Sequence, residues 1–219
     1  MALSVSVIGN SILPYFIFPR VNFESHFIRD GPIGCGGSAH SSGWMTETNF
    51  LKYIKYFSIH ARCSNDHPCL VLIDNYSFYL DVAVLDFCKE NGITLLSFPA
   101  HCSHKLQPLD RNAYGPFKKF VNSACDACVT VNKQLMTIYD IPGMVKTALP
   151  NAITPRNIIS GFQATSIYSF NRDIFSESEF LPSYLTDRAD PSTKMSSVDF
   201  SIAKQTPRNK FQLWIVNKH

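Results

Sequence analysis

The chain lacks the marks of a disordered, membrane-spanning or strongly charged protein. Its 219 residues carry a formal net charge of only +3, which permits nucleic-acid binding but does not favour it. No internal repeat and no dense basic cluster of the nuclear-import kind is present. Hydrophobic residues make up 45% of the chain, including 17 Phe and 9 Tyr, which predicts a folded domain with a sizeable core.

Long hydrophobic runs are also missing. No stretch approaches the roughly 20 apolar residues that cross a bilayer. The uncharged residues 1–19 lack the basic start of a signal peptide and are interrupted by Gly9, Asn10 and Pro14. Apolar and serine residues alternate after Leu3, so this segment predicts strands and not a leader or membrane anchor.

The seven cysteines provide no disulfide framework, because their number is odd and their spacing irregular. Reduced thiols in a cytosolic or nuclear protein are the expectation. Cys125 and Cys128 form a C-x-x-C pair, but no second pair or suitably spaced histidine completes a zinc site. We therefore expect these two as small residues on one helix face.

The apolar pattern predicts a sheet with helices. Leu3–Ile8 and Ile12–Phe18 are expected to form a hairpin around a Gly-Asn-Ser turn. The Gly-, Pro- and Ser-rich segment 19–43 has no period and predicts a long loop. From Ser176 onward the polar composition predicts a loosely packed tail, with a short terminal strand at Phe211–Val216.

A helix is predicted from the capping residue Thr46 to about Arg62. Trp44, just before it, is expected to pack on the sheet rather than to stack on a base. The apolar residues of the helix recur at helical spacing and predict its core face: Phe50, Leu51, Ile54 and Phe57.

A parallel strand–helix–strand unit should follow. Cys69–Ile73 is fully apolar, as in a strand buried on both faces. A helix over 80–90, ended by Gly92, leads to a second buried strand, Ile93–Phe98. The helix is expected to turn four residues inward: Val82, Leu85, Phe87 and Cys88.

Two further helices are expected downstream. One follows Asp110, and a second begins at Thr154-Pro155, where a capping residue precedes proline, and runs to about Phe162. The first should place four residues on one face: Tyr114, Phe117, Val121 and Ala124.

Two acids lie where this arrangement places ligand-binding side chains. Asp74 ends one strand, and Asp110 follows the next strand after a loop; the ends of parallel strands share one crevice. Neighbouring carboxylates repel unless one is protonated or a cation lies between them, and oxygen ligands select Mg²⁺ or Mn²⁺. The alternative is that each Asp simply caps the helix that follows it.

Other side chains near these acids admit two interpretations each. Lys105, Arg111, Lys118 and Lys119 suit non-specific phosphate contacts, or they form a solvated helix face. His101 and His104 suit metal ligation, but we favour hydrogen bonds that hold the turn before Asp110. Two metal ions acting in phosphoryl transfer would need three acids, and two are evident.

The chain resembles the pogo, Tigger and jerky group of DDE transposases over roughly residues 5–187. The resemblance rests on Gly9-Asn10 followed by PYFIFPRVNF, and on these motifs: SGWMTETNF, LIDN, ENGITLLSFPAHCSHKLQPLD, YGPFKKF, IYDIPG and GFQATSIYSFN.

This resemblance implies a ribonuclease H-like α/β fold, a mixed five-stranded sheet flanked by helices and here lacking its first strand. It implies a partial DDE domain at 1–135, a helical extension at 136–187 and a polar tail at 188–219. It makes Asp74 and Asp110 the second and third catalytic acids, which in the family bind Mg²⁺ or Mn²⁺. DNA as partner and the nucleus as location follow from the family's substrate.

Three departures from the family stand out. The first acid, expected in an Asp-Glu motif on a strand before the hairpin, has no counterpart, and Asp30 lies in a loop before Gly31-Pro32. Tyr76 and Tyr79 replace the histidines after the second acid, so a proton relay there is lost. The family's helix-turn-helix region is also absent from these residues.

Three interpretations therefore stay open. The chain is a nucleic-acid-binding domain that has lost catalysis, a Mg²⁺-dependent DNA endonuclease or strand transferase that draws on an upstream acid, or a non-functional transposon fragment. The sequence does not decide whether it is an enzyme. The unmatched first strand would leave a gap in the sheet unless Phe211–Val216 fills it, which we regard as the less favoured arrangement.

Overall fold

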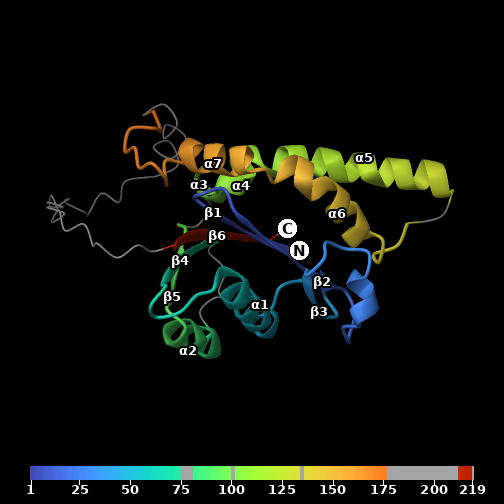
Figure 1. The fold of residues 1–219 in the computed structure, drawn as a ribbon, viewed down its shortest axis with the longest axis horizontal. Coiled ribbons are helices and arrows are strands. Elements are labelled where there is room, and N and C mark those ends of the chain that lie inside the picture. The colour runs from blue at the N-terminus through green and yellow to red at the C-terminus, as the bar shows by residue number, and fades with distance from the viewer. Residues whose placement is uncertain (75–80, 100–101, 134–135, 177–211, 219) are drawn as a thin grey trace, which may run out of the picture.

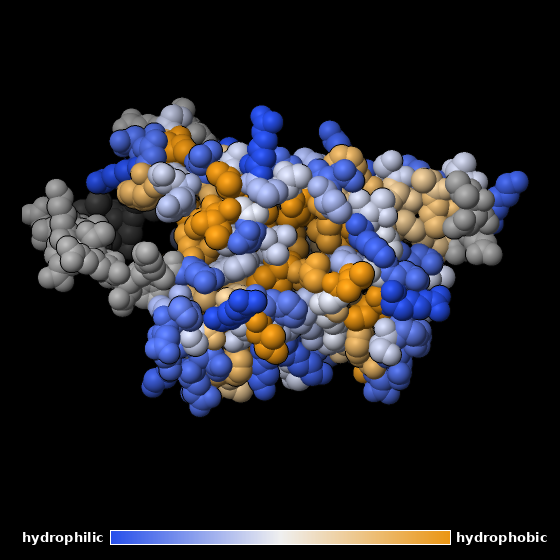
Figure 2. All heavy atoms as spheres, in the orientation of Figure 1, coloured by the Kyte–Doolittle hydropathy of each residue, from blue (hydrophilic) through white to orange (hydrophobic). Residues whose placement is uncertain are grey.

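The computed structural model describes residues 1–74, 81–99, 102–133, 136–176 and 212–218. A mixed sheet lies between two layers of helices (Figure 1). Figure 2 shows hydrophobic residues gathered along the seam between the upper helices and the strands, and hydrophilic residues on the outer surfaces of the lower helices. The expected α/β architecture is confirmed.

The sheet has six strands in the order β3-β2-β1-β6-β4-β5. Pairs β1–β2 and β1–β6 are antiparallel, while β2–β3, β4–β6 and β4–β5 are parallel. The strands are β1 Ala2–Ser6, β2 Ser11–Phe18, β3 Gly36–Ala39, β4 Cys69–Ile73, β5 Ile93–Ser97 and β6 Gln212–Lys218.

Within the described residues, two helices cover one face of the sheet and five lie over the other (Figure 1). The first two are α1 Glu47–Ala61 and α2 Val82–Glu90. The other face carries α3 Ser103–Leu106, α4 Pro108–Asn112, α5 Tyr114–Asn132, α6 Ile141–Ala152 and α7 Pro155–Ala164, and a short 3-10 helix, η1 Ser25–Ile28, contacts α6.

The terminal strand β6 fills the centre of the sheet. It pairs through Trp214–Lys218 with β1 and through Gln212–Ile215 with β4. This confirms the predicted terminal strand. It also places that strand where the resemblance implied a missing first strand, the arrangement that sequence alone disfavoured. The sheet therefore has no gap between β1 and β4.

The two faces of β6 contribute side chains to two different hydrophobic cores. Trp214 and Val216 pack with α1 residues such as Phe57, whose ring meets the indole edge-on at 5.6 Å. Ile215, fully buried, packs with residues of α4 to α7, including Leu109. Alternate residues of one strand thus belong to the two cores, as the pleat requires.

The segment 19–43 is not the unstructured loop that its composition predicted. It contains η1 and the edge strand β3, which pairs with β2, so the described part of the chain forms a sheet of six strands and not five. A Cβ on Gly36 would lie 2.6 Å from the Tyr15 ring, and one on Gly37 would lie 2.6 Å from Phe23. These glycines leave room for aromatic rings, a strand role that composition hides.

The strand–helix–strand unit is present, but its burial differs from expectation. β5 is the edge of the sheet, with Leu96 54% exposed, so it is not a buried strand. On α2, Val84 and Cys88 face the core, whereas Val82 and Leu85 are 70% and 42% exposed. An edge helix has fewer neighbours to bury its apolar residues.

The start of α1 is as predicted, but the residue before it is not. Thr46 Oγ1 accepts the Asn49 N–H at 3.4 Å, and Phe50, Ile54 and Phe57 are buried. Trp44, in contrast, is 67% exposed, so the prediction that it packs on the sheet is wrong. Its turn lies outside the strands, because β3 ends before it at Ala39.

Candidate active site

Asp74 directly follows β4 and is held by a neighbouring hydroxyl. Ser103 at the start of α3 donates a hydrogen bond of 2.7 Å to Asp74 Oδ1. The preceding alternate residues, Leu70 and Leu72, pack in the core beneath α4 to α7. The strand pleat therefore directs Asp74 to the sheet face that carries α4.

Asp110 lies in the first turn of α4, and the residues before it anchor that turn. Leu109 is fully buried in the core. Gln107 is buried as well, and its Nε2 donates to the Val216 carbonyl of β6 at 3.5 Å. The Leu-Gln-Pro-Leu-Asp motif is thus a turn that joins the α4 layer to the central strand and presents Asp110 at the edge.

Close packing from α7 holds α4 in place. A Cβ on Gly161 would lie 2.5 Å from the Pro108 carbonyl oxygen, so only glycine allows this approach. Asn112 Nδ2 also donates to Ser160 Oγ at 2.6 Å. Helix α7 therefore fixes the position of α4, which carries Asp110.

Tyr114, at the start of α5, brings the two acids into one neighbourhood. Burial raises the pKa of its phenol well above the usual value, and the negative charges of Asp110 and Asp74 raise it further. Both carboxylates must lie near this phenol to act on it. That Asp74 and Asp110 converge on one cation stays a prediction.

The carboxylates fit one hard cation better than two. Two carboxylates and water are an ordinary Mg²⁺ ligand set. Strand β6, which lies beside β4, has the sequence QLWIVNK and supplies no acid. Within the described ranges, no group of three or more His, Cys, Asp or Glu side chains is placed to hold a metal.

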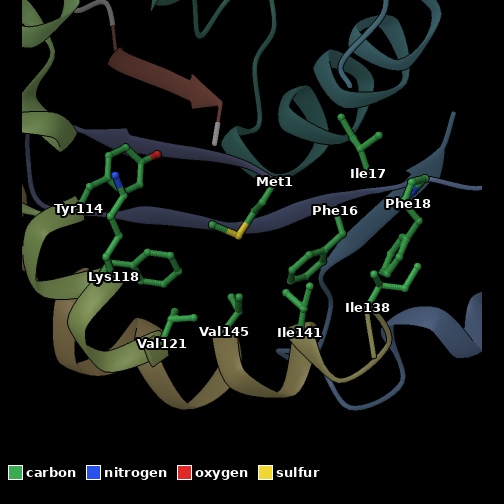
Figure 3. Close-up of a pocket in the computed structure, with 12 residues that line it drawn as sticks. Met1, Phe16, Ile17, Phe18, Tyr114, Lys118, Val121, Ile138, Ile141 and Val145 are labelled. Atoms are coloured by element: carbon green, nitrogen blue, oxygen red, sulfur yellow. The ribbon is translucent and has the colours of Figure 1, made fainter. Parts of the chain in front are cut away.

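The four basic residues differ in setting. Lys105 is half-buried in α3, and Arg111 and Lys119 are exposed on α4 and α5. Lys118 is also exposed, but it lines an apolar cavity of about 340 Å³ between β2, α5 and α6. Figure 3 shows its side chain beside Tyr114, with Met1 and Phe16 reaching into the same space.

Several sequence hypotheses fall elsewhere. Tyr76, Tyr79 and His101 lie outside the described residues. His104 is exposed on α3, and Cys125 and Cys128 are half-buried on α5 and form no disulfide. Sequence reasoning gave Tyr114 only a packing role and gave Ser103 none, because nothing in their local pattern shows that they adjoin the acids.

A mixed α/β sheet with one carboxylate at the end of β4 and a second on helix α4 is the arrangement of ribonuclease H-like domains. The match to a family model makes the assignment specific: residues 20–162 match the DDE superfamily endonuclease family, and the chain belongs to that family. The matched segment contains Asp74, Asp110 and the helices that hold them.

One curated relative extends this comparison. A protein of Cochliobolus lunatus named MFS-type transporter clz9 is 24% identical over 178 residues, which cover 78% of this chain and 19% of that protein. The chain thus spans about a fifth of that relative's length. No solved structure matches the chain significantly. In the part of the chain that the structure describes, no helix has the length and apolarity to cross a bilayer.

Proposed function

We propose that this chain is a transposase-derived DDE domain that binds nucleic acid without cutting it. The observation that carries the proposal is the identity of the central strand. The family's first acid belongs to a strand in this position, and β6 occupies it with no carboxylate. Two acids hold one cation and suit phosphate binding, but two-ion phosphoryl transfer needs a third ligand set.

The surface beside the acids supports contact with a phosphate backbone. Arg111 and Lys119 are exposed on consecutive helices α4 and α5, close in the chain to Asp110. Contacts of this kind neutralise phosphates and read no base sequence, so binding should be non-specific and weaken with salt. Pogo- or Tigger-type ancestry and a nuclear location are part of the same proposal.

The binding surface is tested by removing two charges at a time. Arg111→Gln/Lys119→Gln should weaken binding of a labelled DNA duplex at low salt by roughly tenfold and lower the salt slope by about 2. Lys52→Gln/Lys89→Gln removes the same charge from α1 and α2, in the opposite helical layer, and should bind like wild type. An equal loss of DNA binding in both variants would show that only net charge matters, and would refute Arg111 and Lys119 as the binding surface.

Catalysis is tested with the full chain and supercoiled plasmid in Mn²⁺. Wild type and Asp74→Asn should leave the plasmid equally intact, since the described residues bring no third acid to Asp74 and Asp110. Nicking by wild type that Asp74→Asn abolishes would instead support the Mg²⁺-dependent endonuclease. A chain that fails to unfold cooperatively would support the non-functional fragment.

A further inference from the structure

Cys63 and Cys69 lie in contact, although the chain turns through a loop between them. Cys63 follows the last turn of α1, and Cys69 is the first residue of β4. The Cys63 thiol donates to Cys69 Sγ across 2.8 Å. Sulfur atoms this close need only a small side-chain shift to bond.

The loop between the two cysteines holds their sulfur atoms close together. Ser64 and His67 exchange backbone hydrogen bonds of 3.2 and 3.0 Å, which close the loop into a tight turn. Gly92 packs against this turn so closely that a Cβ there would lie 2.3 Å from the Ser64 carbonyl oxygen. The pair is therefore arranged before any reaction begins.

The two thiols differ in access and in acidity. Cys63 is half-buried, so solvent reaches it, while Cys69 is fully buried. The hydrogen bond that Cys63 donates lowers the pKa of Cys69, and the same bond together with burial raises the pKa of Cys63. Access therefore makes Cys63 the sulfur that meets an oxidant first, and the lowered pKa of Cys69 suits it to attack the oxidised Cys63 as a thiolate.

We propose that Cys63 and Cys69 form an oxidation site that hydrogen peroxide closes into a disulfide between the end of α1 and the start of β4. Cys63 sulfur attacks one peroxide oxygen; the O–O bond breaks, a sulfenic acid forms and water leaves. Cys69 sulfur then attacks Cys63 Sγ; the S–O bond breaks and a second water leaves. Two thiols and one peroxide thus give one disulfide and two waters, with two electrons passing to the peroxide.

The disulfide would link the end of α1 covalently to β4, the strand that Asp74 directly follows. It restricts the unfolded chain over the loop between the two cysteines while leaving the folded arrangement nearly unchanged. The site is independent of the proposed function, because in the described part of the chain the two thiols bond to each other and to the His67 carbonyl and not to the carboxylates. Oxidation should therefore raise the midpoint of thermal unfolding without requiring bound nucleic acid.

The test uses the full reduced chain treated with equimolar hydrogen peroxide, blocked with N-ethylmaleimide and weighed intact. The product should lose about 2 Da and two alkylation sites, both restored by dithiothreitol. Digestion with trypsin and with a protease that cuts before Asp places Cys63, Cys69 and Cys88 on separate peptides, 63–65, 66–73 and 86–89. The expected linked product joins 63–65 to 66–73.

Matched variants decide the assignment. Cys63→Ser should lose the mass change and the roughly 5 °C rise in unfolding midpoint expected on oxidation. Cys128→Ser, at a half-buried thiol on α5, should keep both. A bridge mapped to Cys88 or to Cys125–Cys128 would overturn the proposal. So would sulfinic acid at Cys63 with the thiols of Cys69 and Cys88 still reduced. Cys69→Ala, which removes the buried partner, should lose the same mass change and midpoint rise.

Discussion

Strands β5 and β6 both lie parallel to β4, one on each side, yet they reach this strand by opposite routes. β5 follows β4 after a single helix and forms the exposed edge of the sheet. β6 comes from the far end of the chain and is buried between β4 and β1. A strand close in sequence can pair early in folding. How much it stabilises the fold depends instead on how much apolar surface it buries.

The largest contrast is expected when one apolar side chain is shortened in each strand. Ile215→Ala in β6 removes a fully buried side chain and should cost about 3 kcal/mol of unfolding free energy. Leu96→Ala in β5, at a side chain 54% exposed, should cost less than about 1 kcal/mol. Urea unfolding measures both; equal losses would show that the edge strand matters as much as the central one.

The entry to β5 is expected to be more sensitive than β5 itself. Gly92 has φ +66°, and a Cβ there would meet the Ser64 carbonyl oxygen, so Gly92→Ala should cost about 2 kcal/mol or more. Gly115→Ala in α5, where a Cβ meets nothing within 4 Å, should instead gain about 0.5 kcal/mol. Thermal unfolding of both variants checks the pair, and a destabilised Gly115→Ala would contradict the helical argument.

The hydrogen bond between β6 and the turn that carries Asp110 should contribute less to the unfolding free energy. Gln107→Leu removes the side-chain donor to the Val216 carbonyl and should cost about 1 kcal/mol. The effect should appear in chemical denaturation. Gln163→Leu, at an exposed position on α7, is the control and should leave stability unchanged. If both variants unfold alike, β6 and the turn are not coupled through this bond.

The smallest effect should lie away from both strands. Asp140 accepts the Thr137 N–H at 2.7 Å and the Thr137 hydroxyl at 2.8 Å, and these bonds lower the pKa of its carboxyl. A lowered folded pKa gives stability that is present above the unfolded pKa and is lost as the pH falls through the folded pKa. Asp140→Asn should therefore destabilise slightly at neutral pH and not in strong acid, as followed by urea midpoints.

A control for that pH effect is Asp86→Asn, which changes an exposed carboxylate on α2. Its urea midpoint should shift by the same small amount at both pH values. A larger pH-dependent change at Asp86 than at Asp140 would show that the Thr137 bonds are not the source of the effect.

The parts of the fold that sequence predicted are those whose signals are local. The cap at Thr46, the turn at Gly92 and the apolar strand Cys69–Ile73 each follow from a few neighbouring residues. The position of β6 depends on a partner far along the chain, and no local pattern contains that information. The strand role of Gly36-Gly37 was missed because its cause is the bulk of Tyr15 and Phe23.

The candidate site shows the same division. Asp74 and Asp110 were identified from strand ends and from the family motif. Ser103 and Tyr114 became visible only when the structure brought them beside the acids. Exposure at the edge was also misjudged, since Val82 and Leu85 have the spacing of core residues but lack a neighbouring strand to cover them.

The late position of β6 in the chain also shapes how the domain is made. During synthesis, β1 and β4 leave the ribosome long before Gln212, so for that interval both present unpaired backbone edges. The sheet closes only when its final strand has emerged, and slow translation of the C-terminal segment prolongs the exposed state. Until the central strand arrives, the nascent chain therefore exposes the strand edges through which chains aggregate.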